Sequence, residues 1–159
     1  LLIITDDGQL TFRLTRPEFG FVKRYYFMAF GKLSKAGKER IELGGTLFGN
    51  KRPAKPAHIE NLEHCTVEEC SKYIPKEKLE HCMKNPKGTV STGIISVTEG
   101  QRHEVKLLLR KAGCSVFYLK RLSIGKIILD EALLPGEFRE FTLEEKSLAK
   151  EYRKIRIDL

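Results

Sequence analysis

The chain has 159 residues, of which 41% are hydrophobic and 31% charged, and it carries a formal net charge of +8 with a pI near 9.4. This composition predicts one globular domain, or a large part of one, and excludes a disordered chain. No long apolar segment or secretory signal is present, so we expect a cytoplasmic protein without a membrane anchor. The positive charge favours an anionic partner, most commonly nucleic acid.

The first half of the chain predicts short elements separated by turn residues. The apolar run at 1–5 is typical of a strand, and a strand that begins a chain in this way suggests a truncated polypeptide. The element at 23–30 has aromatic side chains on both faces. The expected strands lie at 1–5, 23–30 and near 57–63, and the expected helices at 9–15 and 34–43.

The second half opens with a polar, cysteine-bearing excursion at 65–88. The final helix begins at Thr142, where Glu145 completes a capping box, and Leu148, Tyr152 and Ile155 form its apolar stripe. Further elements are a helix near 75–84, a strand at 90–98, a helix at 105–112, two strands within 115–129 that meet at Gly125, and a turn at Pro135-Gly136. Helices and strands without strict alternation predict an α+β fold, with a mixed, mostly antiparallel sheet and flanking helices.

Residues 99–121 contain a basic helix face beside a strand that ends in two bases. Val105, Leu108 and Leu109, with Ala112, form one buried stripe of a helix that Gly113 would end. His103, Lys106 and Arg110 repeat on another face, and Lys120 and Arg121 end the next strand. This arrangement suits a phosphate-rich ligand, although a solvated basic face would give the same pattern.

Other polar residues favour structural roles. Cys65, Cys70 and Cys82 occur near His64 and His81, but no closely spaced cysteine pair is present. We therefore expect reduced thiols, as we do for Cys114, and no metal site. Asp6 and Asp7 lie where a turn is expected and are interpreted as turn residues.

Tyr25 and Tyr26 follow Lys23 and Arg24 on the expected strand, and the two rings must point to opposite faces. An aromatic ring beside a base could stack on an unpaired nucleotide. Such residues are also ordinary constituents of strands.

Three blocks in register resemble the ribosomal RNA pseudouridine synthase family over nearly the whole chain apart from 65–88. Val22–Tyr25 resembles the family's Glu-Lys-x-Tyr motif, and Glu99–Lys106 resembles Glu-Gly-x-x-His-Gln-Val-Lys. The other matching segments are 1–17 with its Asp-Gly turn, 119–121, Ile124-Gly125 and the Pro-Gly-Glu signature within 134–142. The form of the His103–Lys106 segment resembles the small-subunit branch more than the large-subunit branches.

The resemblance implies the fold of the synthase catalytic domain and an enzyme that isomerises a specific uridine in ribosomal RNA without metal or cofactor. The target nucleotide leaves its stack, and a carboxylate is the nucleophile. Tyr25 would stack on the base and help to remove the proton from carbon 5, and Lys106 would keep the catalytic carboxylate ionised. The residues expected to contact RNA are Lys23, Arg24, Arg102, His103, Arg110, Lys120 and Arg121.

The chain also departs from the family pattern. Val22 and Glu104 replace the usual Glu and Gln, and Leu107 replaces a basic residue. The nucleophilic Asp is expected in a Gly-Arg-Leu-Asp motif ahead of the strand that begins at Leu1, and neither it nor the family's N-terminal RNA-binding domain occurs in residues 1–159.

We therefore expect residues 1–159 to be a partial catalytic domain. The alternatives are an RNA-binding module that keeps the synthase fold without catalysis, and a basic scaffold protein that binds no RNA. An exposed strand edge near Leu1 predicts self-association.

Overall fold

The computed structural model describes residues 1–47, 49 and 52–151. Five strands form one sheet in the order β2-β3-β1-β4-β5, and every pairing is antiparallel. The expected α+β class is therefore confirmed, with a sheet that is antiparallel throughout the described chain. The strands are β1 (Lys23–Phe30), β2 (His58–Thr66), β3 (Thr89–Val97), β4 (Ser115–Ile124) and β5 (Ile127–Ile128).

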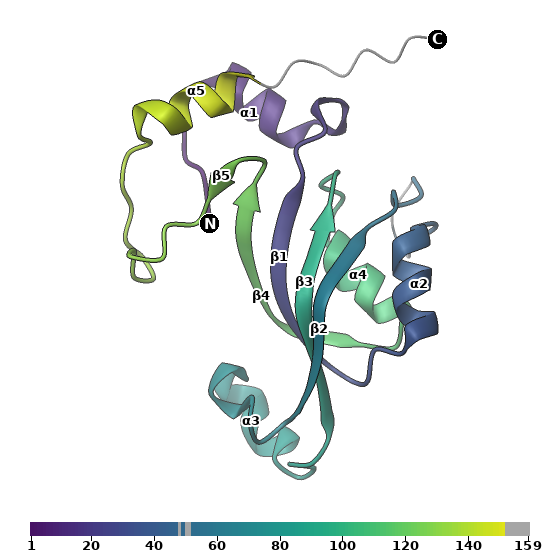
Figure 1. The fold of residues 1–159 in the computed structure, drawn as a ribbon. Helices are drawn as coiled ribbons and strands as arrows, with labels where there is room; N and C mark the ends of the chain where they lie inside the picture. Colours follow the sequence, from purple (N-terminus) through teal and green to yellow (C-terminus); the bar gives the residue numbers. More distant parts are fainter. Residues whose placement is uncertain (48, 50–51, 152–159) are drawn as a thin grey trace.

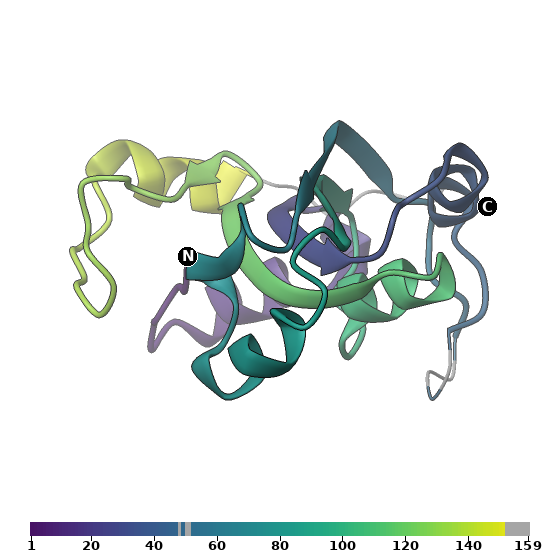
Figure 2. The ribbon, with the colours of Figure 1, turned by 90° about the horizontal axis from the view of Figure 1, so that it is seen from below.

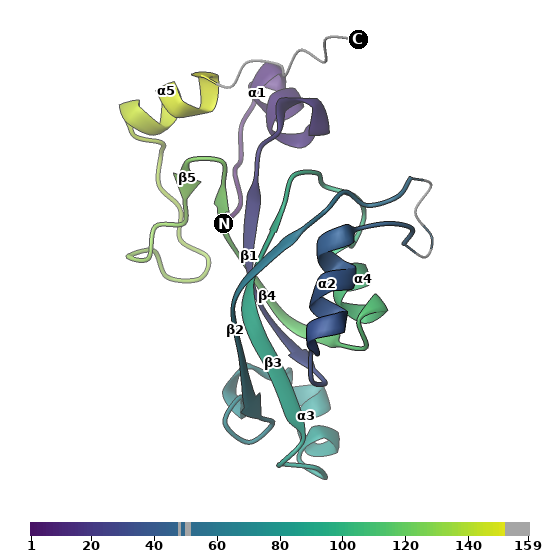
Figure 3. The same cartoon turned by 45° about the vertical axis from the view of Figure 1, so that its right-hand side comes forward.

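The helices lie on the faces and at the two ends of this twisted sheet (Figure 1). Helices α2 and α4 lie side by side on one face, as Figures 1 and 3 both show, while α1 and α5 lie together beyond one end and α3 lies at the other. The α-helices are α1 (Gly8–Thr15), α2 (Lys35–Leu43), α3 (Lys76–Cys82), α4 (Glu104–Lys111) and α5 (Leu143–Glu151), with short 3-10 turns at Pro17–Phe19 and Ser71–Tyr73. None of these described helices is long and apolar enough to cross a bilayer.

Strand β1 supplies side chains to two apolar clusters because it lies at the centre of the sheet. Phe27 and Ala29 face α2 and α4, where they join Leu108 and Leu109 in the main core. Met28 faces the opposite side and packs with residues of the segment between β2 and β3. Seen from below in Figure 2, helices flank the sheet on both sides. The expected strand with aromatic side chains on both faces is confirmed, since Tyr25 and Phe27 pack on one face and Tyr26 and Phe30 on the other.

The excursion after β2 covers one end of the second sheet face. Its helix α3 confirms the helix expected near 75–84. Cys65, Cys70 and Cys82 contribute to the apolar cluster on this face. Burial raises the pKa of the Cys70 thiol to about 12, so this thiol is a packing group rather than a nucleophile.

The prediction of a strand at 1–5 is wrong, because these residues form no strand. Only Leu1 is hydrogen-bonded to the sheet, donating its amine to the Arg121 carbonyl at 3.1 Å and accepting from Arg121 Nε at 3.0 Å. Further pairing with β4 is blocked because β5 occupies the edge of β4 at Ser123 and Ile124. Leu2 and Ile4 are 74% and 86% exposed. Self-association through this segment stays a prediction.

The helix ends follow the sequence signals. Asp7 caps α1 by accepting from the backbone amides of Gln9 and Leu10 at 2.8 and 3.0 Å, which confirms its structural role. Thr142 and Glu145 form the expected capping box, with bonds of 2.8 and 3.1 Å. Leu148 is half-buried on α5, whereas Tyr152 and Ile155 lie outside the described residues.

Gly44 permits the close approach of the segment that follows α2 to Ala54 and Lys55. Its backbone has φ +71°, and a Cβ there would lie 2.7 Å from the Lys55 carbonyl oxygen. Gly45 and Ala54, next to it, form an isolated antiparallel bridge with bonds of 2.8 and 2.9 Å.

Gly44→Ala should therefore lower the free energy of unfolding by about 3 kcal/mol, since it combines a left-handed backbone with a clash against main-chain atoms. Urea denaturation of the full-length protein measures this effect. Gly8→Ala is the matched control, because its Cβ would meet no atom within 4 Å at the start of α1, and its unfolding midpoint should stay the same or rise slightly. Equal midpoints for the two variants would contradict the packing argument.

Candidate active site

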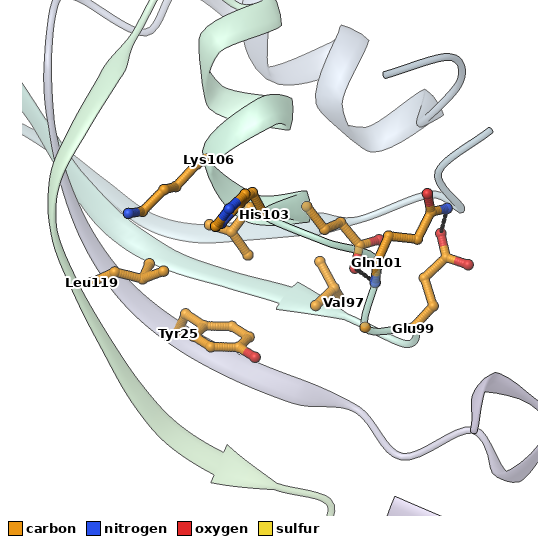
Figure 4. A pocket seen from close by; sticks show the side chains of 10 residues that line it. Tyr25, Val97, Glu99, Gln101, His103, Lys106 and Leu119 are labelled. Atoms are coloured by element: carbon orange, nitrogen blue, oxygen red, sulfur yellow. Dashed lines mark hydrogen bonds between the residues drawn. The ribbon is translucent and has the colours of Figure 1, made fainter. Parts of the chain in front are cut away.

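A pocket of about 150 Å³ lies between the sheet and the start of α4. Tyr25 of β1, Leu119 of β4 and Val97 of β3 form its sheet side, and the loop 99–103 with the first turn of α4 forms the other. Figure 4 shows the Tyr25 ring opposite His103 and Lys106, with Gln101 and Glu99 beyond Val97. Pockets for drug-sized ligands are usually about 300–1,000 Å³, so this space suits one small planar group.

Tyr25 of β1 and Lys106 of α4 lie 81 positions apart in the sequence, and the fold brings both to this pocket. Lys106 is exposed on the first turn of α4, whose apolar stripe of Val105, Leu108 and Leu109 is buried as expected. The stripe fixes the rotation of the helix and so directs Lys106 away from the core. The presence of Tyr25 and Lys106 in the lining of one pocket is the main feature of the site.

His103 lies at the N-cap of α4 rather than within the helix, with a left-handed backbone of φ +54°. It lines the pocket beside Lys106, whereas Arg110, which the sequence placed on the same basic face, is exposed one turn further along α4 and does not line it. Gly113 adopts φ +84° just after the helix, as its expected role at the helix end requires.

The other basic candidates are distributed over different surfaces. The Arg121 guanidinium lies 6.0 Å from the centre of the Tyr25 ring, and Arg102 is exposed in the pocket loop. Lys120 pairs in register with Tyr26 and so lies on the opposite sheet face from Tyr25. Arg24 forms an ion pair with Glu60 and lies on that opposite face too.

Lys23 is buried, with 6% of its surface exposed, although the sequence suggested an RNA contact. Its ammonium group donates to the Phe21 carbonyl at 3.4 Å. Burial is the main cause that lowers the Lys23 pKa, with the Arg121 charge adding to it and Glu104 opposing it. This position favours an electrostatic role inside the protein over a phosphate contact.

The sequence analysis missed two buried acids that contribute to the pocket. Glu99 and Glu104 are only 6% and 4% exposed. Burial first, then the charge and hydrogen bond of Glu99, raise the pKa of Glu104 to about 7. Glu104 occurs in the first turn of a helix, where an acid is ordinary, so the sequence carried no signal that it would be buried against a second carboxyl.

Asp6 and Asp7 lie elsewhere. They line a larger hollow of about 730 Å³ that Leu2, Ile4 and residues 138–149 also border, and not the pocket of Tyr25. No group of three or more metal-ligating side chains occurs among the residues that the structure describes.

Comparison with known proteins relates the chain to RNA-modifying enzymes. It is 33% identical over 150 residues to an uncharacterized RNA pseudouridine synthase of Bacillus subtilis, covering 94% of the chain and 53% of that protein. It is 35% identical over 146 residues to an uncharacterized RNA pseudouridine synthase of Aquifex aeolicus, covering 91% and 49%. The ribosomal small subunit pseudouridine synthase A of Vibrio cholerae is 30% identical over 145 residues, covering 91% and 52%.

Among solved structures, the chain matches a pseudouridylate synthase crystal structure with a TM-score of 0.68 and 28% identity, covering 91% of the chain and 52% of that protein. No family model matches the chain. The chain spans about half the length of the curated relatives that it matches.

Proposed function

This chain is homologous to the RNA pseudouridine synthases over 91% of its length, and from this relationship we propose that its parent protein isomerises a uridine of ribosomal RNA to pseudouridine. The small subunit is the favoured source of the substrate, because several relatives are named ribosomal small subunit pseudouridine synthase A. The reaction takes place in the cytoplasm and requires no metal or organic cofactor.

The shared pocket of Tyr25 and Lys106 is the observation that supports this proposal most directly. In the reaction, the bond between N1 of uracil and C1′ of ribose breaks, the base turns, and a bond forms between C5 and C1′. The proton leaves C5, and N1 gains one. The enzyme therefore has to hold a detached flat ring and assist a proton transfer, which a small pocket with one aromatic wall suits.

Tyr25 stacks on the extruded uracil through its ring, and its phenol takes part in removing the C5 proton. Lys106 lies across the pocket from this ring in Figure 4. Its ammonium group keeps the catalytic carboxylate ionised by charge pairing. Both roles come from the family resemblance, and their placement on two sides of one pocket supports them.

The nucleophile is an Asp that the resemblance places ahead of Leu1. The acids that line the pocket among the described residues, Glu99 and Glu104, do not suit this role. Both are buried, and Glu104, with a pKa raised to about 7, is a poor source of a permanently ionised carboxylate at neutral pH.

RNA contacts come from the basic residues on the pocket side of the molecule. Arg102 and His103 lie in the pocket loop, Arg110 follows on α4, and Arg121 lies beside Tyr25. Arg24 and Lys120 lie on the other sheet face, and Lys23 is buried. We therefore assign these three residues no contact with the nucleotide in the pocket.

The test of function is the isomerisation of uridine in a small-subunit ribosomal RNA transcript by the full-length protein. We expect one defined pseudouridine, detected by carbodiimide modification and primer extension. Residues 1–159 alone should not catalyse the reaction, because the expected Asp is outside them. RNA binding without isomerisation by the full-length protein would favour the non-catalytic RNA-binding module.

RNA binding should weaken steeply with salt. If about four basic side chains contact phosphates, raising NaCl from 50 to 200 mM should lower affinity by roughly a hundredfold, since each neutralised phosphate releases a counterion. Fluorescence anisotropy with a labelled transcript measures this slope. Arg110→Ala should reduce the slope by about one, whereas Lys35→Ala, an exposed change at the start of α2, should not. An affinity that does not change with salt would contradict the basic RNA-binding surface.

A further inference from the structure

Glu99 and Glu104 form a buried carboxyl pair beside the proposed catalytic pocket. Both side chains are almost fully shielded from solvent. Both carboxyls accept hydrogen bonds from Gln101, Glu99 from Nε2 at 2.9 Å and Glu104 from the backbone amide at 3.3 Å. Two ionised carboxylates held on one residue in a buried site repel each other, so this arrangement favours a proton on one of them.

The surrounding donors assign that proton to Glu104. Glu99 Oε1 accepts from the Lys55 backbone amide at 2.7 Å and from Gln101 Nε2 at 2.9 Å. Two short bonds from N–H donors favour the ionised form of Glu99. Glu104 Oε2 accepts a longer bond of 3.3 Å from the Gln101 backbone amide, so a proton on Glu104 disturbs fewer contacts.

The pair fastens the pocket loop to a distant segment of the chain. Gln101, which donates to Glu99, also donates from Nε2 to the Pro53 carbonyl at 3.0 Å, and the Lys55 bond joins the same segment. The loop then ends at His103, whose left-handed backbone is unfavourable for a non-glycine residue and persists only where its surroundings hold it.

We propose that Glu99 and Glu104 share one proton and act as positioning residues that hold the loop presenting His103 and the first turn of α4 presenting Lys106. The consequence for catalysis rests on the proposed function, whereas the proton-sharing pair itself does not. When Glu104 loses its proton, two adjacent carboxylates repel each other and the loop loses its fixed position.

The charges around Glu104 determine when this happens. Glu99 in the loop favours the protonated form, as burial does, and Lys23 of β1 favours the ionised form. His103 and Lys106 are the other titratable groups along the same side of the pocket. Because the pKa of Glu104 is about 7 in the folded protein and near 4.5 when unperturbed, the stability from its protonated form is complete below about pH 4.5. This stability is lost as the pH rises to about 7.

The experiment compares the full-length wild-type protein with Glu104→Gln and Glu39→Gln. The amide of Glu104→Gln has nearly the same shape as a protonated carboxyl and can donate to Glu99 at every pH. Glu39 is exposed on α2, so its variant controls for the loss of one negative charge. Melting temperature is measured from pH 4.5 to 8.5, and kcat/KM for pseudouridine formation from pH 6 to 8.

We expect the melting temperature of wild type, relative to Glu104→Gln, to fall by roughly 5 °C between pH 4.5 and 7 and then to level off. The kcat/KM of wild type should fall about tenfold relative to this variant between pH 6 and 8, following the protonated fraction of Glu104. Glu39→Gln should follow wild type in both measurements.

If the difference in melting temperature between wild type and Glu104→Gln stays constant over this pH range, the proposal that Glu99 and Glu104 share a proton is wrong. If neither wild type nor the variants isomerise uridine, the proposed function is wrong. The melting temperatures still test whether Glu99 and Glu104 share a proton. If Glu104→Gln does not fold, infrared spectra of wild type give the answer. A protonated-carboxyl band at pH 6 that is lost at pH 8.5 supports the pair, and its absence at pH 6 refutes it.

Discussion

Lys106→Ala should lower kcat for pseudouridine formation by roughly 300-fold in the full-length protein, with a smaller change in RNA affinity. Lys106 lines the same pocket as Tyr25, and in the proposed mechanism the catalytic carboxylate needs a nearby positive charge to remain ionised. Removing a charge that stabilises the reacting groups in a preorganised site costs about a hundredfold to a thousandfold in rate. Single-turnover kinetics with saturating enzyme measures this loss without contributions from binding.

Two basic neighbours serve as matched controls for Lys106→Ala. Arg110→Ala removes an exposed charge one turn along the same helix but outside the pocket, so it should weaken RNA binding a few-fold and leave kcat near that of wild type. Arg121→Ala removes one of several expected phosphate contacts and should likewise cost less than Lys106→Ala. Equal losses of kcat in Lys106→Ala and Arg121→Ala would contradict this division of roles.

Local periodicity predicted the elements that place Tyr25 and Lys106. The apolar spacing of Val105, Leu108 and Leu109 fixed the face that α4 buries, and therefore the exposure of Lys106. The alternation of Phe27 and Met28 between two apolar clusters likewise fixed the direction of Tyr25 within β1. Both patterns repeat within a few residues, so their signals do not depend on distant parts of the chain.

Features that depend on tertiary contacts were not predictable from the sequence. The run at 1–5 has the composition of a strand, yet β5 occupies the edge at which it would extend its pairing with β4. Lys23 follows the pattern of a basic residue beside an aromatic one, yet its position at the start of the central strand buries it. The approach of Glu99 to Glu104 likewise depends on a loop conformation that no spacing rule describes.

Tyr25→Phe should lower kcat by about a thousandfold while changing the affinity for RNA less than threefold. The variant keeps the ring that we propose stacks on the base, and it removes only the phenol that we propose takes part in proton removal from C5. A positioned general base contributes about a hundredfold to ten-thousandfold to rate. Since Tyr25 lies at the pocket wall and is only half-buried, the loss of its hydroxyl should leave the fold intact.

Tyr26→Phe is the matched control, because it removes a phenol hydroxyl from the neighbouring residue of the same strand. Tyr26 is the next residue of β1, but it faces the opposite side of the sheet, where it packs against the apolar cluster that contains Met28. Loss of its hydroxyl should cost about 1 kcal/mol of stability or less and leave kcat unchanged at a temperature where the protein is folded. Full activity in Tyr25→Phe would exclude the phenol from proton transfer and leave Tyr25 only as a stacking surface. A loss of activity in Tyr26→Phe would instead place the catalytic aromatic group on the other face of the sheet.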